Sequence, residues 1–414
     1  MLYPLLDYGP ARPKKDARCF KAISYDGLRS PFGRHAGALS TIRADDLAAT
    51  VIRALLERSE LPIDRIEDVI LGYVCQSGED SRNVARFAGL LGGVNEAGGG
   101  LTVNRLCGSG MAAVFDAARS ITVGEADLYL AGGTESMTRA PFVVAKSASA
   151  WGRHPEMYDS TIGTRFPNKL FAREFGDFSM PQTADNLAAE YDIGRQECDE
   201  YAHGSQQRYE AARADGFFKS EILPVEIPGR KGAVTVVDAD EHPRPDTTLE
   251  KMAMLRPLFD GGVVTAANAS GVNDGAGALM IGTRDVGPQP RARIVSGAIA
   301  GVPPRIMGIG PGFAVPKALE RAGVTLADMD VIEINEAFAS QVLACCKQLN
   351  LDPADSRLNP NGGAIAVGHP LGASGARIIL TAMRQLERTG GRYACLSMCI
   401  GVGQGIAMVI ERVA

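Results

Sequence analysis

Two stretches of the chain alternate between helical and strand patterns. In the first, apolar residues recur every three or four positions over 44–56 and 111–121, which predicts amphipathic helices. The segments 69–74 and 127–131 are short apolar runs of the kind that form buried strands. Strands that alternate with helices in this way predict an α/β fold with a largely parallel sheet.

The last third of the chain repeats this pattern. Short apolar runs again predict strands and helical spacing predicts helices, namely strands 331–334, 393–398 and 406–410 and helices 338–349 and 376–383. Two helix starts also agree, because Ser-Gly-Met-Ala at 109–112 matches Ser-Gly-Ala at 374–376. We therefore predict two related α/β halves, residues 19–136 and 266–414.

The middle of the chain, residues 137–265, follows neither pattern. It is rich in aromatic and charged residues and holds turn-forming stretches such as Ile-Pro-Gly-Arg-Lys-Gly at 227–232. Insertions on a rigid α/β scaffold often bind substrate, so we expect this role here. Residues 1–18 are predicted to form an N-terminal extension, which has three prolines and lacks the apolar core of a signal peptide.

Composition narrows the class of protein. The net charge is −5 without a basic stripe, which argues against a nucleic-acid partner, and no apolar run reaches the roughly 18 residues of a membrane span. The five histidines lack the spacing of a metal site, so no metal is predicted. The eight cysteines form no C-x-x-C pair, which favours free thiols in a reducing compartment and makes a cytoplasmic location the expectation.

One cysteine stands at the start of a predicted helix. Cys107 lies in Val-Asn-Arg-Leu-Cys-Gly-Ser-Gly, directly before the helical spacing over 111–121. The positive end of a helix dipole favours a thiolate, and Gly108 and Gly110 let a substrate carbonyl approach backbone N–H groups. Cys107 is therefore a candidate nucleophile, although by itself it is equally consistent with a packed structural thiol.

A histidine stands between glycines before another predicted helix. His369 lies in Gly-Ala-Ile-Ala-Val-Gly-His-Pro-Leu-Gly-Ala-Ser-Gly, and Pro370 fixes the backbone after it. An imidazole held there can take the proton of a nucleophilic thiol. The alternative is a loop histidine that hydrogen-bonds to the backbone.

Two further segments follow predicted strands. Cys399 precedes a Gly-x-Gly-x-Gly run at 401–405, where the strand-like residues that follow exclude a dinucleotide site, because such a site needs a helix there. Asn335 begins Asn-Glu-Ala-Phe-Ala after the strand 331–334, where its amide can hold a water or a carbonyl oxygen. Taken singly, Cys399 is also consistent with a packed thiol and Asn335 with a helix N-cap.

Together these four segments resemble the thiolase family. The patterns N-x-L-C-x-S-G, N-E-A-F-A, G-x-x-x-x-G-H-P-x-G-x-S-G and C-x-G-x-G-x-G occur in the family's order, and the resemblance covers the chain from about residue 19. It implies an α/β thiolase fold, with two αβαβα-type halves in a five-layered arrangement and an inserted loop domain that binds coenzyme A. It also implies coenzyme A as a co-substrate, no covalently bound cofactor, and a homodimer or homotetramer.

The resemblance also implies catalytic roles. Cys107 is similar to the family's acyl-carrying nucleophile, and His369 to its activating base and oxyanion-hole donor. Asn335 resembles the residue that holds a water in the same oxyanion hole. Cys399 resembles the acid/base that moves the α-proton of acetyl-CoA. The backbone N–H groups of Cys107 and Gly401 resemble a second oxyanion hole.

Residues that contact coenzyme A and the acyl group are implied in the same way. The segment 264–275 resembles the family's coenzyme A segment, and Ser270 a pantetheine contact. The complete set of implied contacts is Arg244, Leu258, Phe259, Ala266 and Ser270 for coenzyme A, Met180 for the acyl pocket, and Ala337 and Phe338 beside the thioester.

Several stretches resemble one subfamily, the 3-oxoadipyl-CoA thiolases of aromatic-compound breakdown. These stretches are 76–85, 159–166, 179–186 and 240–249. Such enzymes cleave 3-oxoadipyl-CoA to succinyl-CoA and acetyl-CoA, so a cation should meet the distal carboxylate. Arg165 is the candidate, with Arg139, Lys169 and Arg173 as rivals, and each is also consistent with a surface charge. Ser179 stands where acetoacetyl-CoA thiolases usually have histidine.

Other functions stay open at this point. A general acetyl-CoA acetyltransferase or fatty-acid 3-ketoacyl-CoA thiolase would share all four motifs. A condensing synthase of this fold would normally have histidine or asparagine in place of Cys399. A non-catalytic carrier of CoA thioesters should have lost at least one of the reactive groups, whereas all of them are present.

Overall fold

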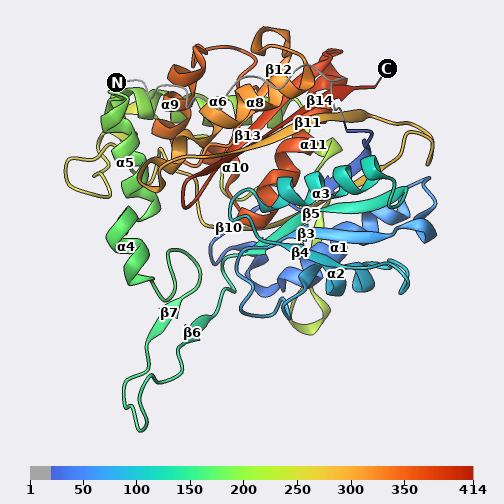
Figure 1. The fold of residues 1–414 in the computed structure, drawn as a ribbon, viewed down its shortest axis with the longest axis horizontal. Coiled ribbons are helices and arrows are strands. Elements are labelled where there is room, and N and C mark those ends of the chain that lie inside the picture. The colour runs from blue at the N-terminus through green and yellow to red at the C-terminus, as the bar shows by residue number, and fades with distance from the viewer. Residues whose placement is uncertain (1–19, 414) are drawn as a thin grey trace.

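A long mixed sheet runs through the molecule (Figure 1). The structure is a computed structural model that describes residues 20–413, so the predicted extension 1–18 lies outside the described residues. Neighbouring strands follow the order β12-β13-β14-β11-β1-β10-β5-β3-β4, and β2 pairs with β10. The strands are β1 (Ile23–Arg29), β2 (Gly33–Arg34), β3 (Asp68–Gly72), β4 (Leu101–Val103), β5 (Leu128–Ser136), β10 (Asn273–Gly282), β11 (Ala292–Gly301), β12 (Val331–Ile334), β13 (Tyr393–Ile400) and β14 (Gln404–Arg412).

The strands of this sheet do not all run in one direction. β3 is parallel to β4 and β5, and β12 is parallel to β13. The other pairings are antiparallel, so the prediction of a largely parallel sheet is wrong. For one antiparallel pair the reason is local. β13 turns directly back into β14 through the glycine turn at 401–403, and a short turn can join only antiparallel neighbours.

The two halves of the sheet share one arrangement. In β3-β5-β10-β1 the strand β10 is antiparallel to both neighbours, and in β12-β13-β14-β11 the same holds for β14. The halves join where β1 and β11 pair at two positions, Ile23 with Arg293 and Ser24 with Ala292. Because β10 pairs with β5 and β1, the predicted boundary at residue 266 separates β10 from the strands beside it.

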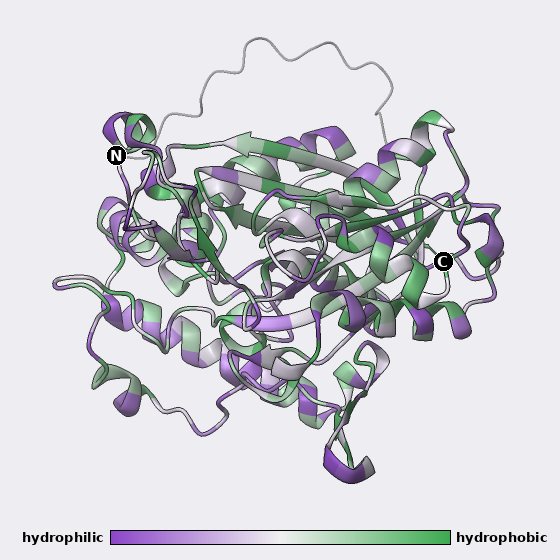
Figure 2. Cartoon of the chain, turned by 90° about the horizontal axis from the view of Figure 1, so that it is seen from below, coloured by the Kyte–Doolittle hydropathy of each residue, from purple (hydrophilic) through white to green (hydrophobic). Residues whose placement is uncertain are grey.

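Helices divide these halves into five layers. α1 (Ala44–Glu57) and α2 (Val84–Gly92) pack on the outer face of the first half, and α8 (Gly310–Ala322) and α9 (Ala339–Leu349) on that of the second. α3 (Ser109–Val123) and α11 (Leu371–Thr389) lie between the halves. Each interface has its own buried apolar cluster, and Figure 2 shows hydrophilic residues mainly on outer helices and loops.

Glycines bring the two central helices together at their N-termini. A Cβ atom on Gly110 of α3 would lie 2.5 Å from the carbonyl oxygen of Gly372 in α11, which is closer than real contacts allow. Gly375 is packed against Met111 in the same way. Larger residues would therefore push apart the two helix starts that follow Cys107 and His369.

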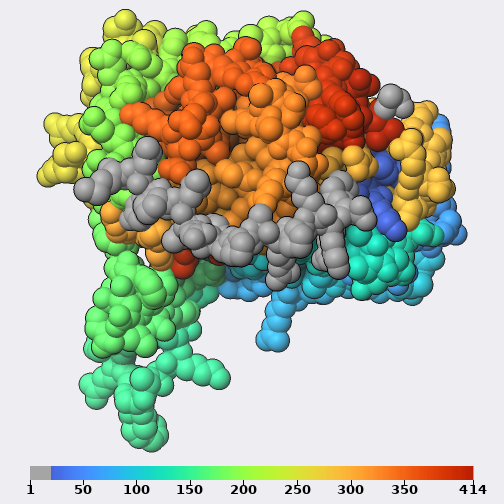
Figure 3. Space-filling view, turned by 45° about the horizontal axis from the view of Figure 1, so that its top comes forward, coloured from blue at the N-terminus to red at the C-terminus, as the bar shows by residue number. Residues whose placement is uncertain are grey.

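The insertion forms an arm and a set of helices beside the second half. It contains β6 (Phe142–Val144), β7 (Met157–Asp159), α4 (Lys169–Phe175), α5 (Met180–Glu190), α6 (Arg195–Ala214), β8 (Val225–Pro228), β9 (Val234–Val237) and α7 (Leu249–Ala253). The β6–β7 hairpin and α4 project from the body of the molecule (Figure 3). α5 and α6 pack against α9, so this part of the insertion is anchored to the second half. None of the helices in the described chain combines the length and apolar character of a membrane span.

Candidate active site

The predicted catalytic segments follow strands of both halves and lie together in a region that we call the catalytic edge. Cys107 follows β4, Asn335 follows β12, Cys399 lies near the end of β13, and His369 lies between α10 (Ala364–Val367) and the start of α11. Since β12 is parallel to β13, their carboxyl ends share this edge. The Asn335 amide nitrogen lies 3.4 Å from Nε2 of His369, and the backbone N–H of Gly401 hydrogen-bonds to Cys107.

Cys107 is a partly exposed residue in a tight turn. Leu106 before it has a φ of 46°, a left-handed conformation that is costly for this residue type. Burial raises the pKa of the Cys107 thiol, and the N–H groups of Gly401 and Cys107 offset this only in part. The thiolate favoured by the helix position in the sequence is thus not the resting form, because removal of water outweighs the N–H groups. Cys107 needs a base to become a nucleophile.

His369 has the form of that base. Nδ1 lies 2.6 Å from Oγ of Ser374, and this hydroxyl donates to the carbonyl oxygen of Pro370 at 2.9 Å. A hydroxyl has one proton, so Ser374 accepts from Nδ1–H, which leaves the lone pair on Nε2. Burial, with the charge of Arg377, lowers the pKa of His369 to about 3. The imidazole is therefore neutral and its basic nitrogen faces Asn335.

Asn335 is buried and incompletely hydrogen-bonded. Its Oδ1 accepts no hydrogen bond from the described residues, although nine-tenths or more of buried polar atoms are usually paired. The alternative of an N-cap is wrong, because the N-cap of α9 is Phe338. An amide with a free acceptor beside a histidine nitrogen can orient a water or a polar substrate atom.

Cys399 is fully enclosed. It packs in an apolar cluster with Ala184, Val264, Met307, Ala337 and Phe338. Burial raises the pKa of Cys399 well above its usual value, and the nearby Cys107 raises it further. The thiol is neutral at rest and suited to donate a proton to a strongly basic carbon atom.

A buried glutamate that the sequence interpretation missed lies behind the site. Glu135, near the end of β5, accepts backbone hydrogen bonds from Val74 at 3.0 Å, Cys75 at 3.1 Å and Gly372 at 2.9 Å. Burial raises the pKa of Glu135 to about 7. The carboxyl group ties the end of β3 to the first turn of α11. Its only sequence signal is a carboxylate after a Gly-Gly pair at a strand end.

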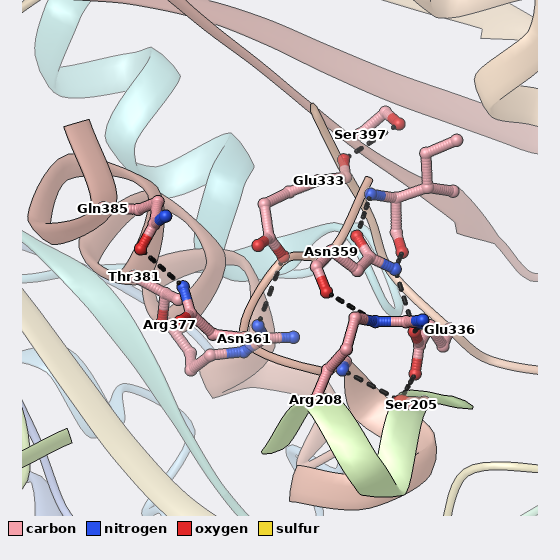
Figure 4. Close-up of polar contacts among 12 residues, drawn as sticks. Ser205, Arg208, Glu333, Glu336, Asn359, Asn361, Arg377, Thr381, Gln385 and Ser397 are labelled. Atoms are coloured by element: carbon pink, nitrogen blue, oxygen red, sulfur yellow. Dashed lines mark hydrogen bonds and ion pairs between the residues drawn. The ribbon is translucent and has the colours of Figure 1, made fainter. Parts of the chain in front are cut away.

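A second missed glutamate connects the insertion to the loop after β12 (Figure 4). Glu336 accepts from the hydroxyls of Tyr201 at 2.9 Å and Ser205 at 2.6 Å, both on α6. It also accepts from the side-chain amide of Asn359 at 2.9 Å and the backbone of Ile365 at 3.2 Å. The residue next to Asn335 is thereby fixed to α6.

A cavity of about 190 Å³ lies between α6, α7 and the predicted coenzyme A segment. Its lining includes two of the predicted contacts, Arg244 and Ala266, together with Gln206, His242, Thr247, Lys251, Met252, Leu255, Ala267 and Ile365. Arg244 and Lys251 give it positive charge. Burial lowers the pKa of His242 to about 4, so this ring is neutral.

The remaining predicted contacts lie outside the lining of this cavity. Leu258 and Phe259 are exposed outside the lining of this cavity. Ser270 lies next to the catalytic edge, because its backbone N–H donates to the carbonyl oxygen of Ala337 at 2.9 Å. It follows the cavity-lining residues Ala266 and Ala267 closely in the chain. The partly exposed Met180 lies against the glycine turn, since a Cβ atom on Gly401 would be 3.6 Å from its sulfur.

Arg165 is held near the same edge. Its Nη1 donates to the carbonyl oxygen of Cys75 and to Oγ of Ser77, both at 2.9 Å. Two of its rivals are paired elsewhere, Arg139 with Glu79 and Arg173 with its exposed neighbour Glu174. The third rival, Lys169, is exposed at the start of α4.

Known protein families cover nearly the whole chain. The family described as thiolase, N-terminal domain, matches residues 25–285, and the family described as thiolase, C-terminal domain, matches residues 288–412.

Individual relatives match over almost their full length. The 3-oxoadipyl-CoA/3-oxo-5,6-dehydrosuberyl-CoA thiolase of Escherichia coli (strain K12) is 54% identical over 95% of this chain and 100% of its own. The beta-ketoadipyl-CoA thiolase of Acinetobacter baylyi is 52% identical over 95% of this chain and 99% of its own. The crystal structure of human mitochondrial 3-ketoacyl-CoA thiolase in complex with CoA is similar, with a TM-score of 0.88 and 42% identity over 95% of this chain and 99% of its own.

Proposed function

Because the chain belongs to the thiolase family and is an acyltransferase, we propose that it cleaves 3-oxoadipyl-CoA with coenzyme A to give succinyl-CoA and acetyl-CoA. The chemistry is supported by one arrangement, in which Asn335 lies beside His369 while Cys107 lies beside Cys399 and the backbone of Gly401. The choice of substrate is supported by relatives of 52–54% identity that are named for 3-oxoadipyl-CoA or beta-ketoadipyl-CoA.

The first half-reaction transfers the acyl group to the enzyme. Nε2 of His369 takes the proton of Cys107, and the thiolate attacks the 3-oxo carbon of the substrate. The bond between C2 and C3 breaks, which leaves succinyl on Cys107 and the enolate of acetyl-CoA. Cys399 protonates the C2 carbon of this enolate, and acetyl-CoA leaves.

The second half-reaction returns the enzyme to its starting state. The Cys399 thiolate takes the proton of incoming coenzyme A, whose sulfur attacks the succinyl thioester. Succinyl-CoA leaves, and the Cys107 thiolate recovers its proton from His369. All protons are thereby returned, and the kinetics are ping-pong.

Two sets of hydrogen-bond donors serve the two carbonyl oxygens. Once protonated, Nε2 of His369 and a water held by Asn335 stabilise the enolate oxygen of acetyl-CoA. The backbone N–H groups of Cys107 and Gly401 stabilise the oxyanion formed at the acyl-enzyme. The hydrogen bond from Gly401 toward the Cys107 sulfur supports this assignment, because it aims that N–H at the reacting atom.

Coenzyme A is proposed to bind in the positively charged cavity and along the segment 266–270. Arg244 and Lys251 supply cations suited to phosphate groups, and Ser270 lies on the route to Ala337 and Phe338. Most of the lining comes from residues 137–265, which supports the proposal that this insertion is the coenzyme A loop domain between two related halves.

The distal carboxylate of the substrate is proposed to bind Arg165. Within the described residues no carboxylate forms an ion pair with Arg165, whereas Arg139 and Arg173 are already paired. Arg165 donates hydrogen bonds to the loop that contains Cys75 and Ser77. This loop borders the site, because the backbone N–H of Cys75 donates to Glu135.

The charge-binding role of Arg165 is tested by Arg165→Met. We expect the KM for 3-oxoadipyl-CoA to rise at least about tenfold, because a charge-assisted hydrogen bond contributes about 1.5 to 3 kcal/mol. Acetoacetyl-CoA, which has no distal carboxylate, should show an unchanged KM, and Arg173→Met is the matched control. Equal effects on both substrates would exclude the role.

The proposed reaction is tested by thiolysis of 3-oxoadipyl-CoA and acetoacetyl-CoA side by side. A clear preference for 3-oxoadipyl-CoA is the expected result. Comparable rates, or faster turnover of acetoacetyl-CoA, would keep the thiolase chemistry and discard the specific substrate. No turnover of either substrate would indicate that the chain is a non-catalytic carrier of CoA thioesters.

We further propose that the chain forms a homodimer or homotetramer in the cytoplasm. Apolar side chains of the projecting hairpin are unusually exposed, with 96% for Trp151 and 67% for Phe142, which favours burial against another copy. Each of the seven cysteines in the described residues is free, as expected in a reducing compartment. Sedimentation equilibrium on the full chain tests the assembly, and a monomer at micromolar concentration would contradict it.

A further inference from the structure

A fully buried asparagine links the coenzyme A segment to the catalytic histidine loop. Asn273 is the first residue of β10 and has no exposed surface. Its Oδ1 accepts the backbone N–H of His369 at 2.8 Å, and its Nδ2 donates to the carbonyl oxygen of Gly33 at 2.9 Å. Because the amide oxygen and nitrogen are both engaged, the side chain is held in one orientation.

The histidine loop is built directly onto this side chain. Gly368 has a φ of 104°, and a Cβ atom there would lie 2.6 Å from Cγ of Asn273. Pro370, on the other side of His369, has no backbone N–H. The hydrogen bond to Asn273 is therefore the contact that fixes the peptide N–H of His369, while Ser374 fixes its ring.

The same segment borders the positively charged cavity. Ala266 and Ala267 line that cavity, and a Cβ atom on Gly271 would collide with the ring of His242, which also lines it. Between these points Ala269 forms a β-bridge with Phe338 in the loop after Asn335. The residues 266–273 thus contact the cavity on one side and both catalytic loops on the other.

We propose that Asn273 is a positioning residue for His369, and that residues 266–273 couple occupancy of the coenzyme A cavity to the placement of the imidazole. The inference rests on the proposed function for the use of the cavity by coenzyme A. Asn273 does not touch the reacting atoms. It acts through the backbone of His369, whose displacement by about 1 Å costs about a hundredfold in rate.

Two variants separate this role from simple stabilisation. Asn273→Asp keeps the oxygen that accepts from His369 and loses the donor to Gly33. Asn273→Leu has a similar size and provides neither bond, and Asn273→Ala replaces it if the leucine variant does not fold. Both variants break the bond to Gly33, and thermal unfolding of each shows how much of a loss in activity follows from lost stability.

We expect the aspartate variant to keep kcat within about fivefold and the leucine variant to lose about a hundredfold, with the KM for coenzyme A nearly unchanged in both. The alkylation rate of Cys107 by iodoacetamide should fall in parallel, because it reports activation by His369. Equal losses of kcat in both variants, or an unchanged kcat in the leucine variant, would overturn the proposal.

The coupling is tested with desulfo-coenzyme A, which lacks the reacting sulfur. In the wild type it should slow amide hydrogen exchange across residues 364–372, and in the leucine variant this protection should disappear while binding persists. Protection that is equal in both proteins would overturn the coupling. Measuring kcat with acetoacetyl-CoA as well keeps this result separate from the substrate assignment, since positioning of His369 affects both substrates alike.

Discussion

The catalytic edge and a large cavity lined by Asp26, Asp215 and Arg384 differ in how their polar groups are partnered. The cavity has a volume of about 810 Å³ and four arginines, but Arg384 and Arg58 are paired with Asp26, Arg388 with Asp215, and Arg291 with Glu387. At the catalytic edge Oδ1 of Asn335 is buried and has no hydrogen-bond partner among the described residues. We therefore assign the proposed chemistry from neutral groups with shifted pKa values and an unpaired amide oxygen, and not from volume and charge.

The difference arises from burial. Burial keeps the two candidate thiols and the imidazole neutral, because it raises the pKa of Cys107 and Cys399 and lowers that of His369. In the large cavity each arginine is charged and forms an ion pair with a carboxylate.

Cys399→Ala removes the proposed proton donor. We expect thiolysis to fall by about 10³-fold or more, since general acid catalysis contributes 10² to 10⁴. Alkylation of Cys107 should remain, because His369 is intact. The matched control is Cys395→Ala on the same strand, whose thiol is buried in a different apolar cluster. Comparable activity of both variants would remove Cys399 from the mechanism.

Asn335→Ala removes the amide beside Nε2 of His369. The turnover number should drop by about 10²-fold, in the range measured for loss of one oxyanion-hole donor, with little change in KM. Asn361→Ala is the control, because this buried amide bonds to Gln385 rather than to His369. A rise in KM with an unchanged kcat would show that Asn335 only binds substrate.

His369→Gln tests the neutral imidazole through stability. In the folded state the pKa of His369 is about 3. Below pH 6.5 the imidazole therefore binds a proton in the unfolded chain and stays neutral in the folded chain. Between pH 7 and pH 5 the wild type should therefore lose about 2 kcal/mol more stability than the variant. Denaturant unfolding at both pH values measures this. Parallel losses would mean that the imidazole is protonated in the folded protein.

Arg388→Gln changes the large cavity. Its ion pair with Asp215 is exposed on both sides, so the free energy of unfolding should change by less than about 1 kcal/mol. Thiolysis should stay within about twofold of the wild type. A loss of activity as large as that of Asn335→Ala would remove the distinction between the two regions.

The sequence was sufficient for the parts that depend on local pattern. The predicted helix over 44–56 and strand 331–334 correspond closely to α1 and β12, because apolar spacing follows the side that packs on the sheet. The motifs around Cys107 and His369 also predicted the thiolase family, which the family matches confirm.

Features that depend on distant contacts were not predictable. The contact of Asn273 with His369 joins residues 96 positions apart, and nothing near either residue indicates it. The direction of β10 depends on its pairing with β5 across the whole insertion. The raised pKa of Cys107 depends on burial in the folded chain, and the helix N-terminus alone suggested the reverse.

The central claim is that Cys107, activated by a neutral His369, carries the acyl group. Incubation of the wild type with succinyl-CoA, followed by acid quenching, digestion and mass spectrometry, tests this most directly. We expect one succinyl group on the peptide that contains Cys107, its removal by free coenzyme A, and no label on Cys399. Succinyl on Cys399, or an unlabelled Cys107 in a preparation that turns over 3-oxoadipyl-CoA, would contradict it.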